Sequence, residues 1–172
     1  TSGNEAEGIA PDPVLAEKAR AEFHKMEMGD PDNIALWKWF VQISLEEYQK
    51  TYRQLDITFD SYKGESFYTD KMPAQVQKLR DKGLLKLDDG ASIVDLSAYD
   101  MPPGSTLYPP RDIAAAVYRK QEYHFDKCIY VTSAQQILHF RQWFKVVELM
   151  GYDWYDELVH VPYGTVSVNG AT

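Results

Sequence analysis

The chain has 172 residues, of which 44% are hydrophobic and 13% aromatic, so it can build one domain or two small lobes. Its formal net charge of −8 argues against a free-standing nucleic-acid binder, because phosphate contacts need clustered lysine and arginine. No apolar run reaches the roughly 18 residues that span a bilayer, which predicts a soluble, cytoplasmic protein with no membrane partner.

Two helical stretches are expected at the beginning of the chain. Asp12-Pro13 has the form of a helix cap followed by proline at the first helical position, and residues 14–28 are good helix formers. Residues 33–55 carry apolar and aromatic side chains at helical spacing, which fits one long helix or two abutting helices. Within this stretch the aromatic cluster 37–40 predicts core packing for most of its members, as does Trp143-Phe144 later in the chain.

Strand signals follow. Residues 57–62 are partly β-branched and aromatic, which predicts a strand that delivers Gly64-Glu65-Ser66 at its end. Residues 71–82 are typical of a helix that Gly83 ends. Residues 84–96, with Asp and Gly at the turn, predict a small β-hairpin.

The second part of the chain alternates between helix and strand. The expected elements are a helix over 113–123 that opens at Asp112, a strand over 128–132, a helix over 134–150 and a strand over 158–161. This alternation is the signature of a parallel α/β sheet with crossover helices. We therefore expect a mainly helical part over residues 1–101 and an α/β part over residues 102–172.

Residues at four places in the chain are candidates for a ligand site. Ligands of open α/β sheets sit beyond the carboxyl ends of the strands, where Glu65, residues 133–136 and Gly164 should gather. Tyr108 and Asp112, four residues apart, can aim a phenol and a carboxylate into one pocket. The alternative is that Asp112 only caps the helix.

Other chemistry is not expected. The single cysteine, Cys128, lies in an apolar run and suits a small buried side chain. His24 and His124 lie in polar helical settings and are expected at the surface. No spacing of cysteine and histidine typical of a metal site occurs.

Four segments, taken in order, resemble the catalytic core of the arginyl-tRNA synthetases, which are class I enzymes. These are Gly64-Glu-Ser66, Leu107-Tyr-x-x-Arg-Asp112, His139-Phe-x-Gln142 and His160-Val-Pro-Tyr-Gly164. The resemblance covers almost the whole chain. It implies the second half of a Rossmann-like nucleotide-binding fold, preceded by a mainly helical insertion with a small β-hairpin.

The resemblance also implies roles for particular residues. Tyr108 and Asp112 would recognise the guanidinium of L-arginine, and Glu65 would add a second carboxylate. The amide of Gln136 would hydrogen-bond the polar backbone end of the same amino acid. None of these residues is expected to act as a general acid or base.

The implied activity is that of an arginine–tRNA ligase, which activates L-arginine with ATP to arginyl-adenylate and transfers it to tRNA(Arg). The segment that contains His160 and Gly164 would border ATP. Mg²⁺ would come with ATP, since it usually binds substrate phosphates with few protein ligands. Contacts with tRNA(Arg) are expected mainly from segments outside this chain.

The chain departs from the family pattern in ways that bear on activity. The His-Ile-Gly-His-like and Lys-Met-Ser-Lys-Ser-like signatures of class I are expected outside residues 1–172, so the isolated chain is predicted to be inactive. The junction Pro103-Gly104 is shorter than in the family, and Pro109-Pro110 stiffens the link between Tyr108 and Asp112. The alternative function is a non-catalytic arginine-binding or protein-interaction module derived from the synthetase.

Overall fold

The computed structural model describes residues 12–88, 91–101, 106–107 and 109–164 of the chain. The chain divides into two compact units, Thr1–Tyr62 and Lys63–Thr172. This boundary lies earlier than the division at residues 101 and 102 that the sequence suggested. That division separates a mainly helical insertion from an α/β half of a catalytic domain, and it stays a prediction.

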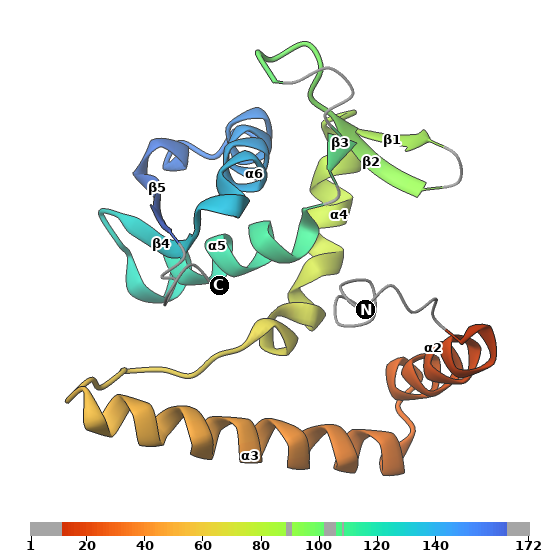
Figure 1. Ribbon diagram of the computed structural model, residues 1–172. Coiled ribbons are helices and arrows are strands. Elements are labelled where there is room, and N and C mark those ends of the chain that lie inside the picture. The colour runs from red at the N-terminus through yellow and green to blue at the C-terminus, as the bar shows by residue number, and fades with distance from the viewer. Residues whose placement is uncertain (1–11, 89–90, 102–105, 108, 165–172) are drawn as a thin grey trace. The chain divides into compact units, whose positions relative to one another are not determined.

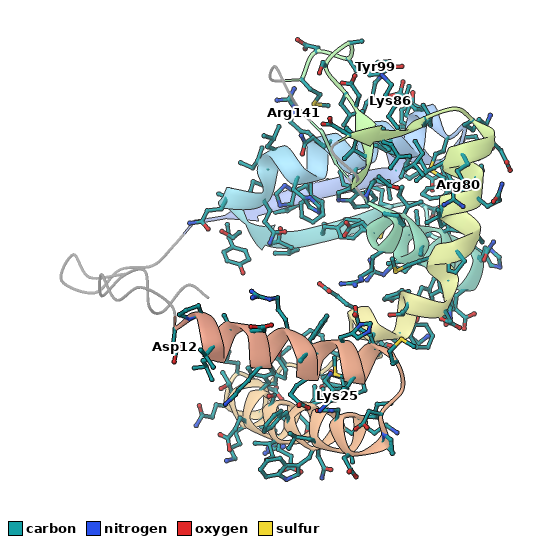
Figure 2. All side chains as sticks on the ribbon, turned by 90° about the vertical axis from the view of Figure 1, so that its right-hand side faces the viewer. Asp12, Lys25, Arg80, Lys86, Tyr99 and Arg141 are labelled. Carbon is teal, nitrogen blue, oxygen red and sulfur yellow. The ribbon has the colours of Figure 1, made fainter. Side chains whose placement is uncertain are left out.

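The first unit is a pair of helices, α2 (Pro13–Glu27) and α3 (Pro31–Gln54), shown at the red and orange end of the ribbon in Figure 1. Helix α3 is continuous, which decides between the two alternatives for this stretch. The cap of α2 is the predicted one, because Oδ1 of Asp12 accepts a hydrogen bond from the Val14 amide at 2.9 Å. In Figure 2, Asp12 marks the beginning of α2 and Lys25 its last turns.

Asp30 caps α3 in the same way. Its Oδ1 accepts from the Asn33 amide at 3.0 Å and lies 3.2 Å from the Asn33 side-chain nitrogen. The change Asp30→Ala removes these acceptors, so we expect α3 to lose about 1 kcal/mol of stability. Amide exchange of α3, followed by NMR, should become about fivefold faster under fast-closing conditions. Asp30→Asn retains an acceptor and should exchange nearly as the unchanged chain does; equal exchange in all three chains would contradict the cap.

The strand predicted over residues 57–62 is wrong. These residues run in irregular backbone after α3, and Asp56 takes a positive φ of 53° at the helix end. The Phe59 ring packs edge-on against Tyr52 and Tyr62, with ring centroids 4.8 and 5.7 Å away. Aromatic residues favour strands only where a neighbouring strand offers a surface to pack on, and here that surface is the end of α3.

Neither helix of the first unit contains a buried residue in its described length. The core packing predicted for the cluster 37–40 is therefore wrong for Trp39 and Phe40, whose exposed fractions are 54% and 53%. Their rings instead contact each other with centroids 5.2 Å apart. Helical periodicity identified the helix but not a surface to cover its apolar side.

The second unit begins with two helices and a small antiparallel sheet. The elements are the 3₁₀ helix η1 (Glu65–Lys71), α4 (Met72–Asp81), β1 (Leu85–Asp88), β2 (Ala91–Asp95) and β3 (Thr106–Leu107). Strands β1 and β2 form the predicted hairpin, with Leu85 opposite Val94. The two-residue strand β3 adds to β2 and was not predicted, because so short a segment has no readable period.

The remainder of this unit alternates as predicted. The elements are α5 (Pro110–Tyr123), β4 (Cys128–Ser133), η2 (Ala134–Gln136), α6 (Ile137–Leu149), η3 (Tyr155–Glu157) and β5 (Leu158–Tyr163). Strands β4 and β5 pair in parallel, with Cys128 opposite Leu158 and Ser133 opposite Tyr163, and α6 makes the crossover between them (Figure 1). The α/β prediction for this part is therefore confirmed, as a two-stranded parallel sheet.

A main hydrophobic core and a smaller cluster around Tyr68 lie in the second unit. The fully buried side chains of the main core include Leu79 of α4, Val94 of β2, Ile113 of α5 and Trp143 of α6. Cys128, Phe144 and Tyr130 pack against it while half-buried. The core thus fixes the first turn of α5 against the beginning of α6, which positions the site described next.

Candidate functional site

An open pocket of about 560 Å³ lies in the second unit, where η1, the first turn of α5 and the beginning of α6 meet. The lining residues are Glu65, Met72, Pro110, Arg111, Asp112, Gln136 and His139. Its size lies in the range of small-molecule sites. The pocket therefore brings together three residues that the sequence singled out, Glu65, Asp112 and Gln136.

Asp112 enters the pocket from the first turn of α5. That helix begins at Pro110, with Pro109 as the N-cap, so the expectation that the helix opens at Asp112 is wrong by two residues. Proline suits the first helical position because an N–H group there has no acceptor within the helix, so its absence costs no hydrogen bond. Asp112 thus lies inside the first turn, where the unpaired amides favour a negative charge.

The charge state of Asp112 is set by opposing effects. Burial raises the pKa of the Asp112 carboxyl above its ordinary value, while the neighbouring His139 lowers it and Glu65 raises it. His139 Nε2 lies 3.3 Å from Asp112 Oδ2. In the sequence, His139 belongs to a motif but was not assigned to the pocket. The available signal was its spacing of three residues from Gln136 on the helix predicted over residues 134–150.

Glu65 reaches the pocket from η1 rather than from a strand end. Its Oε2 accepts a hydrogen bond from Nη1 of Arg111 at 2.8 Å. The Glu65 side chain is 80% exposed, so the pair contributes little to stability. The sequence did not predict this partner, although Arg111 stands beside Asp112 in the same motif.

Aromatic packing fixes η1 on α5 and so places Glu65. Tyr68 is buried, and the Phe67 ring meets Tyr118 of α5 edge-on with centroids 5.0 Å apart. Lys63, just before η1, donates to the hydroxyls of Tyr118 at 2.6 Å and Tyr123 at 3.1 Å. These contacts tie the Gly-Glu-Ser segment to the helix that carries Asp112.

Gln136 ends η2, directly after β4, and lines the pocket as an exposed side chain. Ser133 begins this turn, with its Oγ accepting from the Gln135 amide at 3.3 Å. The prediction that residues after the first parallel strand reach a ligand site is consistent with this position. Tyr108 lies outside the described residues, as does the junction Pro103-Gly104.

His160 and Gly164 are not among the residues that line the pocket. His160 lies on β5, where its Nε2 is 2.8 Å from Oγ1 of Thr132 on β4, and its ring stacks on Phe140 with centroids 4.1 Å apart. Gly164 follows β5 directly, and a Cβ atom built there would meet no atom of the described residues within 4 Å. Phe140 lies between the pocket and β5: its ring stacks on His160, and the preceding residue, His139, contacts Asp112.

The charges of the lining residues favour a cationic ligand. The lining has two carboxylate side chains, Glu65 and Asp112, and one guanidinium, that of Arg111, which pairs with Glu65. Among the described residues, no three acidic, histidine or cysteine side chains gather as metal ligands would. The described helices also include none with the length and apolarity needed to cross a bilayer.

Comparison with known proteins defines the class. Residues 4–171 match the family described as tRNA synthetases class I (R), catalytic domain, and the chain belongs to this family. Its curated relatives include proteins named arginine–tRNA ligase from Clostridioides difficile, 54% identical over 93% of this chain, and Halothermothrix orenii, 52% identical over 93%. The chain spans 30% of the length of each of these relatives.

A solved structure agrees with this assignment. The arginyl-tRNA synthetase from Plasmodium falciparum superimposes with a TM-score of 0.72 and 26% identity, over 90% of this chain and 30% of that one. The resemblance suggested by the four sequence motifs is therefore confirmed. The α/β fold is shared with this structure.

Proposed function

We propose that this chain is the arginine-recognising part of an arginine–tRNA ligase. The observation that carries the proposal is the convergence of Glu65, Asp112 and Gln136 on one pocket, whose lining has two carboxylate side chains and one guanidinium. A guanidinium is a planar fork of donors that pairs best with a carboxylate, and Asp112 offers one in the first turn of α5. The whole enzyme would activate L-arginine with ATP and transfer it to tRNA(Arg) in the cytoplasm.

In this proposal Asp112 and Tyr108 bind the guanidinium, and Gln136 binds the amino and carboxyl end of the amino acid. Glu65 acts together with Arg111, because the two side chains are paired. The Glu65 carboxylate therefore neutralises Arg111 as well as attracting the ligand. The sequence suggested two unpaired carboxylates, whereas here only Asp112 remains as the main acceptor for a guanidinium.

We place ATP beside the end of β5, with the second half of a Rossmann-like fold as the frame. Open space next to Gly164 and the fixed ring of His160 support this placement. ATP would supply the adenylyl group that activates the carboxylate of arginine, with pyrophosphate as the leaving group. The described residues offer no donor set that would hold Mg²⁺ without ATP. The acidic charge of the chain supports tRNA(Arg) contacts mainly from other segments.

Binding of L-arginine and of L-citrulline to the purified chain, measured by isothermal titration calorimetry, tests the arginine pocket. Citrulline has nearly the same shape but no charge, so we expect arginine to bind at least about tenfold tighter. Equal affinity for both ligands, or no binding of arginine, would contradict the proposal. Arginine-dependent exchange of pyrophosphate into ATP by the complete gene product separates an active ligase from a non-catalytic arginine-binding module.

A further inference from the structure

His139 is a pocket residue to which none of the motif roles applies. It lies one turn after Gln136 on the face of α6 that lines the pocket, and its Nε2 is 3.3 Å from Oδ2 of Asp112. Both side chains are partly exposed, at 38% for His139 and 41% for Asp112. The imidazole therefore lies against the carboxylate while both groups remain open to solvent and ligand.

We propose that His139 is a positioning residue of the guanidinium pocket, which holds one oxygen of the Asp112 carboxylate and leaves the other for the ligand. This inference rests on the proposed arginine pocket. A neutral imidazole with its proton on Nε2 can donate to the carboxylate. Held this way, the carboxylate has a fixed orientation before the ligand arrives, which reduces the entropy lost on binding.

The same contact makes ligand binding depend on pH. Histidine side chains change charge between about pH 5 and 8. A protonated His139 is a cation on the carboxylate that an arginine guanidinium must reach, so it competes with the ligand. Binding is then linked to release of a proton, and affinity falls as the pH falls, with a limiting slope of about tenfold per pH unit.

The other charged groups around Asp112 do not reverse the expected fall of arginine affinity at lower pH. Glu65, from η1, favours a cation in the pocket, and Arg111, from α5, opposes one. These two are paired with each other at 2.8 Å, so their effects on Asp112 largely cancel. On the α6 side, the ring beside His139 is Phe140, which carries no charge. In this proposal His139 is therefore the neighbour of Asp112 that competes with the ligand.

Calorimetric titration of L-arginine into three chains tests the inference. Between about pH 5.5 and about pH 8 the affinity of the unchanged chain should change by about tenfold or more, and that of His139→Gln by a clearly smaller factor, which Asp112 itself contributes. Glutamine keeps an uncharged donor but takes up no proton in this range, so the pH dependence of the affinity, and not the affinity itself, is the readout. The matched control is His24→Gln, which changes an exposed histidine of α2 and should keep the full pH dependence.

Equal pH dependence in the unchanged chain and His139→Gln would overturn the role of His139 while leaving the arginine pocket intact. A chain that binds no arginine would overturn both. A second readout needs no ligand: titration of the Asp112 carboxyl by ¹³C NMR. Loss of the imidazole should raise the Asp112 pKa in His139→Gln, and in His139→Asn if the first variant folds poorly, because His139 lowers that pKa. An unchanged Asp112 pKa would refute the contact.

Discussion

Asp112→Asn is expected to weaken the binding of L-arginine by about 10- to 100-fold, because a hydrogen bond to a charged group contributes about 1.5–3 kcal/mol. Asparagine keeps the shape of the side chain but removes the charge that a guanidinium pairs with. The measurement is calorimetric titration of the unchanged chain and the variant at neutral pH. Binding of L-citrulline, which lacks the cation, should change much less.

Loss of fold does not explain such a result. Because the folded chain raises the Asp112 pKa, the ionised carboxylate opposes folding at neutral pH, and a neutral asparagine removes that opposition. The variant should therefore unfold at the same or a higher denaturant concentration. The matched control is Asp126→Asn, a change at an exposed carboxylate between α5 and β4. If Asp112→Asn bound arginine as the unchanged chain does, Asp112 would be excluded from guanidinium recognition.

Trp143→Ala is expected to cost the second unit about 3–5 kcal/mol of its free energy of unfolding. Trp143 lies on α6 with no exposed surface, and its ring meets Tyr130 and Phe144 at centroid distances of 5.2 and 4.4 Å. Removal of the indole leaves a cavity in the core that holds α5 against α6. Urea denaturation followed by circular dichroism measures the loss.

The chain supplies its own control for this substitution. Trp39→Ala makes the same chemical change on α3, where the side chain is 54% exposed, and it should cost about 0.5 kcal/mol or less. A similar loss for both variants would mean that Trp143 does not carry the core of the second unit.

Local patterns were sufficient for most of the second unit. The helices and the parallel pair β4 and β5 are long and bounded by clear turn residues, so periodicity alone located them. The strand predicted over residues 57–62 failed because strand propensity measures fit to a neighbouring surface, which a sequence does not show. Strand β3 was missed because its two residues form a strand only through their pairing with β2, which the sequence does not show either.

The pocket was predicted in part. Motif order pointed to Glu65, Asp112 and Gln136, and the structure brings all three to one place. The partners of the two carboxylates were not predictable, because Arg111 and His139 pair with residues far away in sequence, and charge patterns do not specify which groups meet. Tyr108 lies outside the described residues and stays a prediction.

The alternation along β4 determines which sequence changes this family member can accumulate. Ile129 and Val131 point outward with exposed fractions of 57% and 63%, whereas Cys128 and Tyr130 are half-buried against the core. Substitutions at the outward positions leave the core unchanged. A single-residue insertion would exchange the two faces and turn Tyr130 away from the core. Relatives of this chain should therefore vary more in residue type at positions 129 and 131 than at positions 128 and 130, and should keep the length of β4.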